Sequence, residues 1–167
     1  CLLNANFEWI VPLMNRWIFF VFGFLLIMEA SAQRVYTDNS VLSTGNWYRI
    51  AVSAPGVYKI DAAFLNNLGI QGAISSSAIR LYGNGGKMLP ENNFTPRTDD
   101  LLENAILVED GGDGNFNGSD YFLFYADDPH AWIPDSINKK FFHQKNLYSG
   151  ESYYYISLGG VGKRIPV

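Results

Sequence analysis

The sequence has almost no cysteine and little histidine, and both shortages restrict the chemistry that it can support. Its single cysteine is Cys1, so no disulfide framework can form within the chain. The two histidines, His130 and His143, lie thirteen residues apart, with neither an H-x-x-x-H spacing nor a nearby cysteine. We therefore expect structural or surface positions for both histidines, and not a zinc site.

Basic runs and catalytic signatures are also missing. Lys and Arg number 12 against 16 Asp and Glu, a formal net charge of −4 without a basic stripe, so nucleic acid is not expected as a partner. No G-x-S-x-G turn is present, and the segment GNGGK at 83–87 is followed by Met88, where a phosphate-binding loop needs Ser or Thr. The sequence thus has no serine-hydrolase motif and no phosphate-binding motif, and no cofactor other than calcium is expected.

The hydrophobic run near the N-terminus is too short to span a bilayer. Trp17–Met28 has 12 residues, whereas a spanning helix needs about 20. Arg16 precedes the run and the small residues Ala30-Ser31-Ala32 follow it, which is the pattern of a secretory signal peptide cleaved after Ala32. We therefore expect a signal-peptide helix within 14–32, export through it, and a location in the periplasm, at the outer membrane or on the cell surface.

The signal peptide divides the chain into three parts. Residues 1–13 precede the first methionine, Met14, and are expected to be upstream sequence that is not native protein. Residues 33–167 form the mature part, a β-rich N-terminal domain without cysteine, which suits an oxidising compartment. Because the sequence stops soon after the aromatic run Tyr153–Ile156, this domain is expected to be truncated at its C-terminal end.

Short apolar and aromatic runs, separated by clusters of Gly, Asn, Asp and Pro, predict an all-β fold of the sandwich type. The expected strands are 47–52, 57–60, 78–82, 103–109, 121–125, 141–142 and 153–158. The first two flank Ala54-Pro55-Gly56, which is a turn signal, so a β-hairpin is expected there.

One short helix is expected near 61–68. The carboxylate of Asp61 can accept hydrogen bonds from the free amides of the first turn. Gly69 supplies the left-handed residue that ends the helix. The apolar residues of one face are Phe64, Leu65 and Leu68. A helix of two turns is too short to be stable alone, so its burial must hold it.

The segment DGGDGNFNGSD at 110–120 has two interpretations. Asp113, Asn115, Asn117 and Gly118 fill the first, third, fifth and sixth places of a calcium-loop pattern. The twelfth place holds Phe124 and not the required Glu, so the segment is no EF-hand. It is either a turn between two strands, with Asx turns and Phe116 anchored in the core, or a partial calcium site. The ligands of that site would be Asp113, Asn115, Asn117 and Asp120.

Two further groups of residues each allow a functional and a structural interpretation. The carboxylates Asp99, Asp100 and Glu103 are either a catalytic cluster or the solvated rim of a polar loop. Four aromatic residues either line a binding groove or pack into the core, as alternating aromatic residues of strands usually do. They are Tyr82, Trp132, Tyr153 and Tyr155.

Four segments, taken together, resemble a known family. They are WYRIAVSAPGVYKIDAAFLNNLGI, IRLYGNGGKMLPENN, RTDDLLENAILVEDGGDGNFNGSDYFLFYA and FHQKNLYSGESYYYISLG. The order and spacing of their motifs resemble the N-terminal region of the type IX secretion system sortases of Bacteroidetes, which are gingipain-like cysteine peptidases. The resemblance extends over Ser40–Arg164, which is nearly all of the mature part.

The resemblance implies a prodomain-like accessory β domain of an exported enzyme that removes C-terminal sorting domains from cargo and attaches the cargo to surface lipopolysaccharide. The family's catalytic Cys and His lie in a caspase-like domain downstream, so no catalytic residue is carried over to this chain. The implied partners are that downstream domain of the same chain, outer-membrane components of type IX secretion and the cargo proteins. The loops YGNGG and DGNFNGSD would be contact surfaces, as exposed loops on a rigid sheet.

The alternative is a free-standing exported β-sandwich that binds carbohydrate or protein through the aromatic groove. The two hypotheses differ in the coding sequence that each predicts downstream of Val167. An accessory domain predicts a reading frame that continues and encodes a Cys-His pair, whereas a binding module predicts a stop codon soon afterwards.

Overall fold

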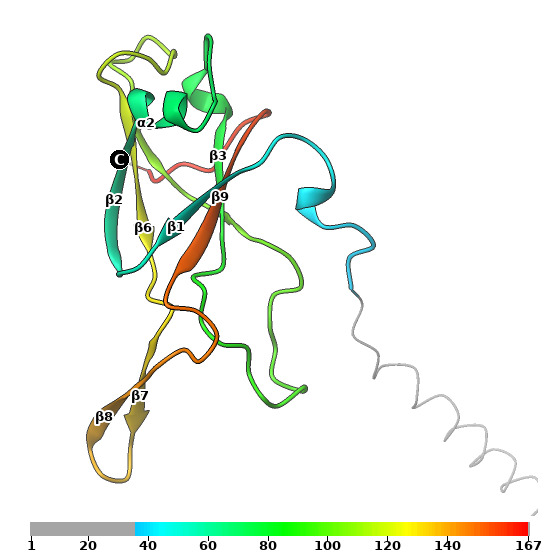
Figure 1. The fold of residues 1–167 in the computed structure, drawn as a ribbon, viewed down its shortest axis with the longest axis vertical. Helices are drawn as coiled ribbons and strands as arrows, with labels where there is room; N and C mark the ends of the chain where they lie inside the picture. Colours follow the sequence, from blue (N-terminus) through cyan, green and yellow to red (C-terminus); the bar gives the residue numbers. More distant parts are fainter. Residues whose placement is uncertain (1–35, 167) are drawn as a thin grey trace, which may run out of the picture. The chain divides into compact units, whose positions relative to one another are not determined.

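The computed structural model describes residues 36–166, so the signal-peptide helix expected within 14–32 lies outside them (Figure 1). The described part is mostly β-structure with one short α-helix, which confirms the all-β class. The strands are β1 (Tyr48–Val52), β2 (Gly56–Asp61), β3 (Ile79–Tyr82), β4 (Glu103–Asn104), β5 (Leu107–Glu109), β6 (Tyr121–Ala126), β7 (Ala131–Asp135), β8 (Lys140–Gln144) and β9 (Ser152–Leu158). The helical elements are η2 (Val41–Ser43), α2 (Ala62–Asn67) and η3 (Ser76–Ala78).

The strands of residues 36–166 form three antiparallel sheets. Sheet A has the strand order β1-β9-β3-β4, and sheet B has the order β2-β6-β5. The third sheet contains only β7 and β8, and we refer to it as the ribbon. Figure 1 shows the ribbon projecting from one end of the body that sheets A and B form.

Sheets A and B bury the hydrophobic core between them. Tyr154 and Ile156 of β9 point into this core from sheet A, and Phe122 and Phe124 of β6 point into it from sheet B. The ring centroids of Phe124 and Tyr154 lie 5.2 Å apart, so these two side chains join the sheets directly. Full burial of such a side chain stabilises the fold by about 1.5–3 kcal/mol. The arrangement is that of a β-sandwich.

The prediction of a hairpin from 47–52 and 57–60 is wrong, although both strands are present. β1 pairs with β9 in sheet A and β2 pairs with β6 in sheet B, so the turn at Ala54-Pro55-Gly56 connects the two sheets. The Tyr58 hydroxyl donates a hydrogen bond of 2.8 Å to the Ala54 carbonyl and fixes this corner. Local turn chemistry is the same for a hairpin and for a sandwich corner, so the sequence could not separate them.

The single strand expected over 103–109 is also wrong, because its two halves belong to different sheets. β4 ends sheet A and β5 ends sheet B, and the chain crosses between them at the fully buried Ile106. The Ile106 amide donates to the Lys163 carbonyl at 3.2 Å, and the Ile165 amide donates to the Ile106 carbonyl at 3.0 Å. Residues 161–165, which we call the C-terminal segment, therefore hold the crossing in place.

The short helix expected near 61–68 is confirmed. The carboxylate of Asp61 accepts a hydrogen bond of 2.8 Å from the Phe64 amide at the start of α2. Leu65 is fully buried, whereas Phe64 is 39% exposed, so the buried face is narrower than expected. Gly69 follows in the left-handed region with φ 89°. Among residues 36–166, no helix has the length and hydrophobicity to cross a membrane.

Candidate functional site

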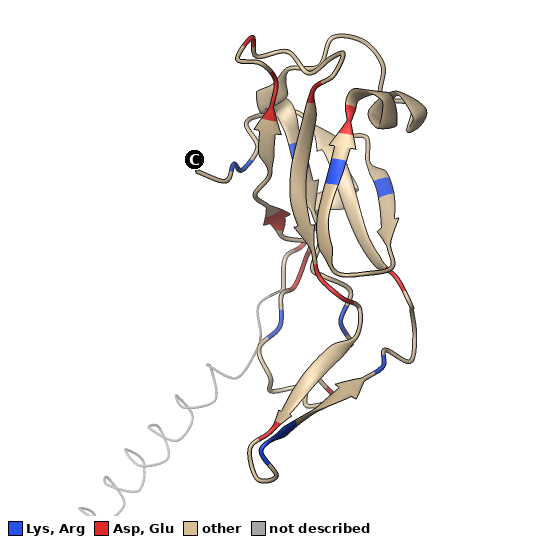
Figure 2. Ribbon diagram, turned by 90° about the vertical axis from the view of Figure 1, so that its left-hand side faces the viewer, with Lys and Arg blue, Asp and Glu red and all other residues tan. Residues whose placement is uncertain are grey.

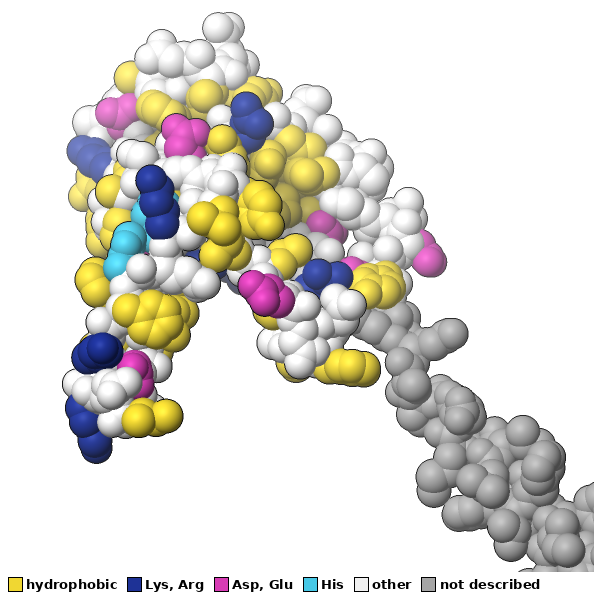
Figure 3. Space-filling view, turned by 60° about the horizontal axis from the view of Figure 1, so that its bottom comes forward, with side chains coloured by type: hydrophobic (Ala, Val, Ile, Leu, Met, Phe, Trp, Pro, Cys, Tyr) yellow, Lys and Arg dark blue, Asp and Glu magenta, His cyan; other side chains and the backbone are white. Residues whose placement is uncertain are grey.

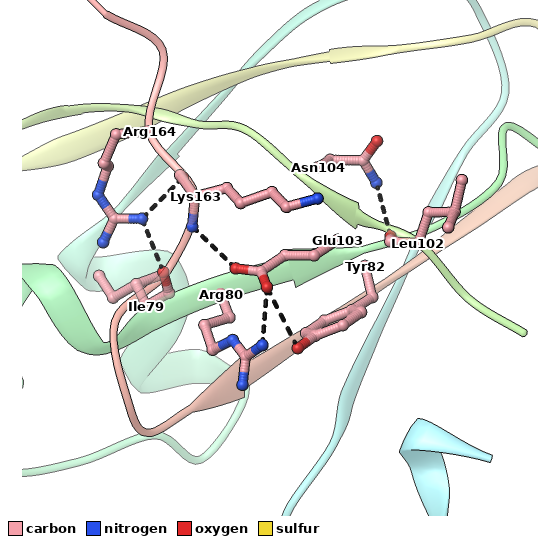
Figure 4. Close-up of polar contacts among 8 residues, drawn as sticks. All are labelled: Ile79, Arg80, Tyr82, Leu102, Glu103, Asn104, Lys163 and Arg164. Atoms are coloured by element: carbon pink, nitrogen blue, oxygen red, sulfur yellow. Dashed lines mark hydrogen bonds and ion pairs between the residues drawn. The ribbon is translucent and has the colours of Figure 1, made fainter.

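A cluster of hydrogen-bonded polar side chains lies on the outer face of sheet A, at the edge formed by β3 and β4 (Figure 4). Arg80 and Tyr82 share this face because they are two residues apart in β3, and Glu103 of β4 lies opposite Tyr82 in the ladder. Glu103 Oε2 accepts a hydrogen bond of 2.7 Å from Arg80 Nη2 and lies 3.5 Å from the Tyr82 hydroxyl. We call Arg80, Tyr82 and Glu103 the β3–β4 cluster.

The C-terminal segment is bonded to the β3–β4 cluster and to the backbone next to it (Figure 4). The Lys163 amide donates to Glu103 Oε1 at 2.8 Å, so both carboxylate oxygens of Glu103 are engaged. Arg164 donates from Nη1 to the Ile79 carbonyl at 3.1 Å and from Nη2 to the Ser76 carbonyl at 2.6 Å. These bonds link β3, β4 and the C-terminal segment, which are far apart in the sequence.

The protonation states of the β3–β4 cluster suit a structural link and not acid–base chemistry. Burial opposes ionisation of Glu103, but the hydrogen bonds from Arg80 and from the Lys163 amide outweigh it and hold the pKa of Glu103 below its usual value. Burial, together with the Glu103 charge, raises the pKa of Tyr82, so the phenol stays neutral. A carboxylate that is ionised and hydrogen-bonded through both oxygens is a poor general base.

A cleft of about 390 Å³ opens between η3, β5 and the C-terminal segment. The polar side chains that line it are Ser75, Ser76, Ser77, Asp110 and Arg164. The Ser76 hydroxyl and the Gly112 amide hold the pKa of Asp110 below its usual value. Neither histidine of the chain lines the cleft, so a serine nucleophile there would lack the base that activates it.

The carboxylates Asp99, Asp100 and Glu103 are neither a joint catalytic cluster nor a freely solvated rim. Asp99 accepts hydrogen bonds from the amide and the hydroxyl of Thr37. Asp100 accepts from the Ser40 hydroxyl at 2.8 Å and from the Val41 amide. The Val41 and Leu101 amides lower the pKa of Asp100. Asp99 and Asp100 thus fasten the chain before β1 to the long loop between β3 and β4.

The YGNGG loop after β3 contains glycines that a larger residue could not replace without displacing neighbours. A Cβ at Gly83 would lie 2.5 Å from Cδ1 of Tyr154, whose ring is in the core. A Cβ at Gly86 would lie 2.6 Å from the hydroxyl oxygen of Ser152, and Gly86 has a positive φ of 73°. The Ser152 hydroxyl in turn donates to the Gly85 carbonyl at 2.7 Å. The glycines are therefore explained by close packing.

Two carboxylate oxygens of the expected calcium loop accept hydrogen bonds from amides of the same loop. Asp113 Oδ1 accepts from the Asn115 amide and Asp120 Oδ2 from the Asn117 amide, each at 2.8 Å. Phe116 is buried, and its ring centroid lies 6.1 Å from that of Phe122, so the loop is anchored in the core as expected. Among the residues that the structure describes, no three His, Cys, Asp or Glu side chains gather into one group. The expected site combines two such carboxylates with two asparagines, so it stays a prediction.

The two expected contact loops lie at opposite ends of the sandwich. Residues 83–87 lie at the end from which the ribbon projects, whereas residues 110–120 lie at the other end, near α2 (Figure 1). The second position agrees with the bridge between Ser75 and Asn115. One compact partner would therefore contact only one of these loops.

His130 and His143 lie together at the base of the ribbon. Their ring centroids are 5.4 Å apart, and His143 also packs against Trp132 at 5.0 Å. Nδ1 of His130 accepts a hydrogen bond of 2.9 Å from the amide of Asn146, which is buried. Asn146 donates from Nδ2 to the Gly86 carbonyl at 2.9 Å, so these residues join the ribbon to the YGNGG loop.

The aromatic groove is not assembled as expected from its four residues. Tyr82, Tyr153 and Tyr155 lie on the outer face of sheet A, but Tyr82 is only 5% exposed and packs edge-on against Trp47. Trp132 belongs to the ribbon, in a separate sheet. The four side chains therefore do not form one surface.

Sequence reasoning missed two features of the domain. The first is the ion pair of Arg80 with Glu103, which joins residues 23 positions apart in the sequence. The second is β7, whose Trp132 and Ile133 resemble a strand but are followed by Pro134. Proline lowers the expectation of a strand, although an edge strand tolerates it, so Trp132-Ile133 beside Phe141-Phe142 was the available signal for the ribbon.

Comparison with known proteins shows a likeness to a solved structure. No protein-family model matches the sequence, and none of the curated proteins matches it. Among solved structures, the chain is similar to the crystal structure of dimeric latent PorU from Porphyromonas gingivalis, with 28% identity over 73% of this chain and a TM-score of 0.53. The match covers 10% of the PorU chain, so this chain spans about a tenth of that protein's length. The likeness shows a PorU-like fold.

Proposed function

We propose that the chain is the N-terminal accessory β domain of an exported gingipain-like cysteine peptidase of the type IX secretion sortase kind. The domain itself performs no catalysis. Its parent enzyme removes the C-terminal sorting domains of cargo proteins and works in the periplasm, at the outer membrane or on the cell surface. Its partners are the catalytic domain of the same polypeptide, outer-membrane components of the secretion system and the cargo.

The likeness to PorU is the observation that carries this proposal. PorU is a type IX secretion sortase, and 28% identity over 73% of the chain goes with a TM-score of 0.53. The motifs that resemble the sortase family extend over the same domain. The resemblance of the short motifs and the likeness of the whole fold therefore support the same family.

The chemistry of the described residues is consistent with a role in packing and docking. Glu103 and Asp100 use their carboxylates to fasten chain segments to one another. The serines of the cleft have no histidine beside them. A rigid sandwich with bonded carboxylates and exposed apolar side chains suits a domain that positions other proteins.

A deletion in the native host tests the proposal. The codons for residues 37–166 are removed in frame, and the secreted cargo is examined by mass spectrometry for its C-terminal sorting domain. We expect the cargo to retain this domain. Immunoblotting of the parent protein is the control, because a loss of abundance alone would also abolish processing. Normal processing at normal abundance would contradict the proposal and favour a separate binding module.

A further inference from the structure

The ribbon carries large apolar side chains on both of its faces. Trp132 and Phe141 share one face with Pro134 and His143, as the pairs Trp132↔His143 and Pro134↔Phe141 require. Trp132 is 65% exposed and Phe141 67% exposed. On the other face, Phe142 is opposite Ile133 and is 48% exposed.

The ribbon has only two strands and no hydrophobic core of its own, unlike the sandwich formed by sheets A and B. A two-stranded sheet alone is marginally stable in water, and its exposed aromatic side chains add to that cost. Figure 3 views the end from which the ribbon projects, and hydrophobic, histidine and basic side chains lie together there. A surface of this composition is typical of an interaction site.

The backbone of the ribbon is open along one edge and interrupted along the other. Pro134 has no amide hydrogen, and a strand accommodates proline where its nitrogen faces away from the partner strand. We therefore infer that Pro134 and Phe141 form a non-hydrogen-bonded pair, in which both residues direct their backbone groups outward. The amides and carbonyls of Phe141 and, two residues on, His143 therefore face outward along β8. On the outer edge of β7, Pro134 offers no donor. An added strand consequently fits β8 and not β7.

The charges around β8 select the kind of strand. Lys139 precedes β8, Lys140 is its first residue and Lys145 follows it. Asp135 is the only carboxylate between Ala131 and Lys145. Three lysines against one aspartate give residues 131–145 a charge of +2, which leaves −6 on the rest of a chain whose total is −4. Among residues 36–166, no ion pair joins these lysines to a carboxylate. Figure 2 shows the basic residues at the ribbon tip.

We propose that the open edge of β8 is a docking site for an extended strand of a partner protein, apolar in its centre and acidic at both ends. Main-chain hydrogen bonds to Phe141 and His143 hold the strand in register. Its central apolar side chains pack against Trp132, Phe141 and Phe142. Its acidic ends pair with Lys139 and Lys140 at one end and with Lys145 at the other.

Two other occupants fit the ribbon less well. A lipid bilayer would accept the aromatic and lysine side chains, but the open backbone groups of a two-stranded ribbon cannot be satisfied in hydrocarbon. A second copy that paired through β8 in an antiparallel arrangement would place Lys139 and Lys140 of one copy near Lys145 of the other. Like charges in facing positions are destabilising, so the charge pattern opposes this dimer.

Two synthetic peptides test the proposal by fluorescence anisotropy with the purified chain. Both have the same central run of alternating Val and Thr, but one has Glu residues at both ends and the other has Lys residues. We expect the Glu peptide to bind and to bind more weakly as the ionic strength rises. We expect the Lys peptide not to bind. No binding of the Glu peptide, or equal binding of both peptides, would overturn the proposal.

A pair of substitutions at one position separates the backbone edge from the aromatic side chain. Both Phe141→Pro and Phe141→Val remove the aromatic ring. Phe141→Pro also removes the outward amide hydrogen, whereas Phe141→Val keeps it. Neither change breaks a β7–β8 hydrogen bond, because this amide faces outward. We expect Phe141→Pro to bind the Glu peptide about tenfold more weakly than Phe141→Val, the effect of about one lost hydrogen bond. Equal binding by the two variants would overturn the use of the edge.

The remaining experiments test the role of the three lysines, check that each variant is folded, and test a membrane and a second copy as alternative occupants. The triple variant Lys139→Glu, Lys140→Glu, Lys145→Glu is expected to exchange the preference toward the Lys peptide. Near-ultraviolet circular dichroism confirms that each variant is folded before binding is measured. If the chain cosediments with phosphatidylglycerol vesicles and Phe141→Pro cosediments equally well, a membrane is favoured and the proposal is overturned. If the chain forms a concentration-dependent dimer that competes with the Glu peptide, self-pairing is favoured and the proposal is also overturned. The proposal does not depend on the enzyme family proposed above.

Discussion

Glu103 connects three separate parts of the domain through one carboxylate. It accepts hydrogen bonds from Arg80 of β3 and from the Lys163 amide of the C-terminal segment, while its own strand is the edge of sheet A. The side chain of Glu103 is 11% exposed, so solvent screens this ion pair less than an ordinary surface pair. Its loss would leave the Arg80 guanidinium and the Lys163 amide without an acceptor.

We expect Glu103→Gln to lower the free energy of unfolding by about 1–3 kcal/mol, the usual range for a hydrogen-bonded charge that is partly buried. Urea denaturation measures this change. Glu91→Gln, in the exposed part of the long loop, is the matched control and should change stability by less than about 0.5 kcal/mol. Equal effects of the two substitutions would show that the β3–β4 cluster is not a structural link.

The pH dependence of stability should follow from the same carboxylates. The pKa values of Glu103 and Asp100 are lower in the folded chain than in the unfolded chain. A depressed pKa contributes stability that is present above the unfolded pKa and lost as the pH falls through the folded one. We therefore expect the free energy of unfolding to decrease below about pH 4, where unfolded carboxylates begin to protonate.

Urea titrations at several pH values measure this dependence. The Glu103→Gln variant should lose stability less steeply in acid than the unaltered chain, because it lacks one of the carboxyl groups whose pKa is lowered by folding. Identical acid slopes for the two proteins would contradict the assignment of a depressed pKa to Glu103.

Gly83 provides a second prediction for a single residue. A Cβ at this position would lie 2.5 Å from the Tyr154 ring, and Tyr154 cannot move freely because its hydroxyl accepts a hydrogen bond of 2.9 Å from the Asp127 amide. We expect Gly83→Ala to destabilise the domain by about 1–3 kcal/mol, as overpacking a core does. Thermal denaturation measures the loss. Gly150→Ala, where no atom lies within 4 Å, is the control. A neutral Gly83→Ala would show that the loop relaxes freely.

At the scale of helices and strands, the sequence predicted the elements whose boundary signals lie within a few residues of each other. The helix near 61–68 has a capping aspartate, a buried leucine and a terminal glycine, and each of these features is present in α2. The elements that failed depend on distant partners. The turn at 54–56 and the crossing at Ile106 are decided by which sheet each strand joins, and no neighbouring residue records that choice.

The loop at 110–120 remains open to a direct test. Asp113 and Asp120 already accept hydrogen bonds from Asn115 and Asn117 amides within the loop. Calcium would have to compete with these amides or bind through the second oxygen of each carboxylate, and the pattern lacks the bidentate Glu that completes such a site. We expect no heat in a calorimetric titration of the chain with calcium. Saturable heat that Asp113→Asn and Asp120→Asn abolish would instead establish the partial calcium site.

For the molecule as a whole, the sequence predicted the class of fold but not the candidate surface. Alternating apolar residues and turn clusters were enough for an all-β sandwich, and the family motifs agree with the likeness to PorU. The ribbon was not predicted, because it is unusual in exposing its apolar residues. Patterns of hydrophobicity identify what a chain can bury, and they cannot show that a pair of strands stays uncovered.

The central claim is that this sandwich is the accessory domain of a sortase-like peptidase. The most direct measurement is the nucleotide sequence downstream of the codon for Val167 in the native gene. We expect the reading frame to continue for several domain lengths and to encode a Cys and a His in an alternating α/β pattern. A stop codon within a few dozen codons would contradict the claim, and the chain would then have to function as a binding module by itself.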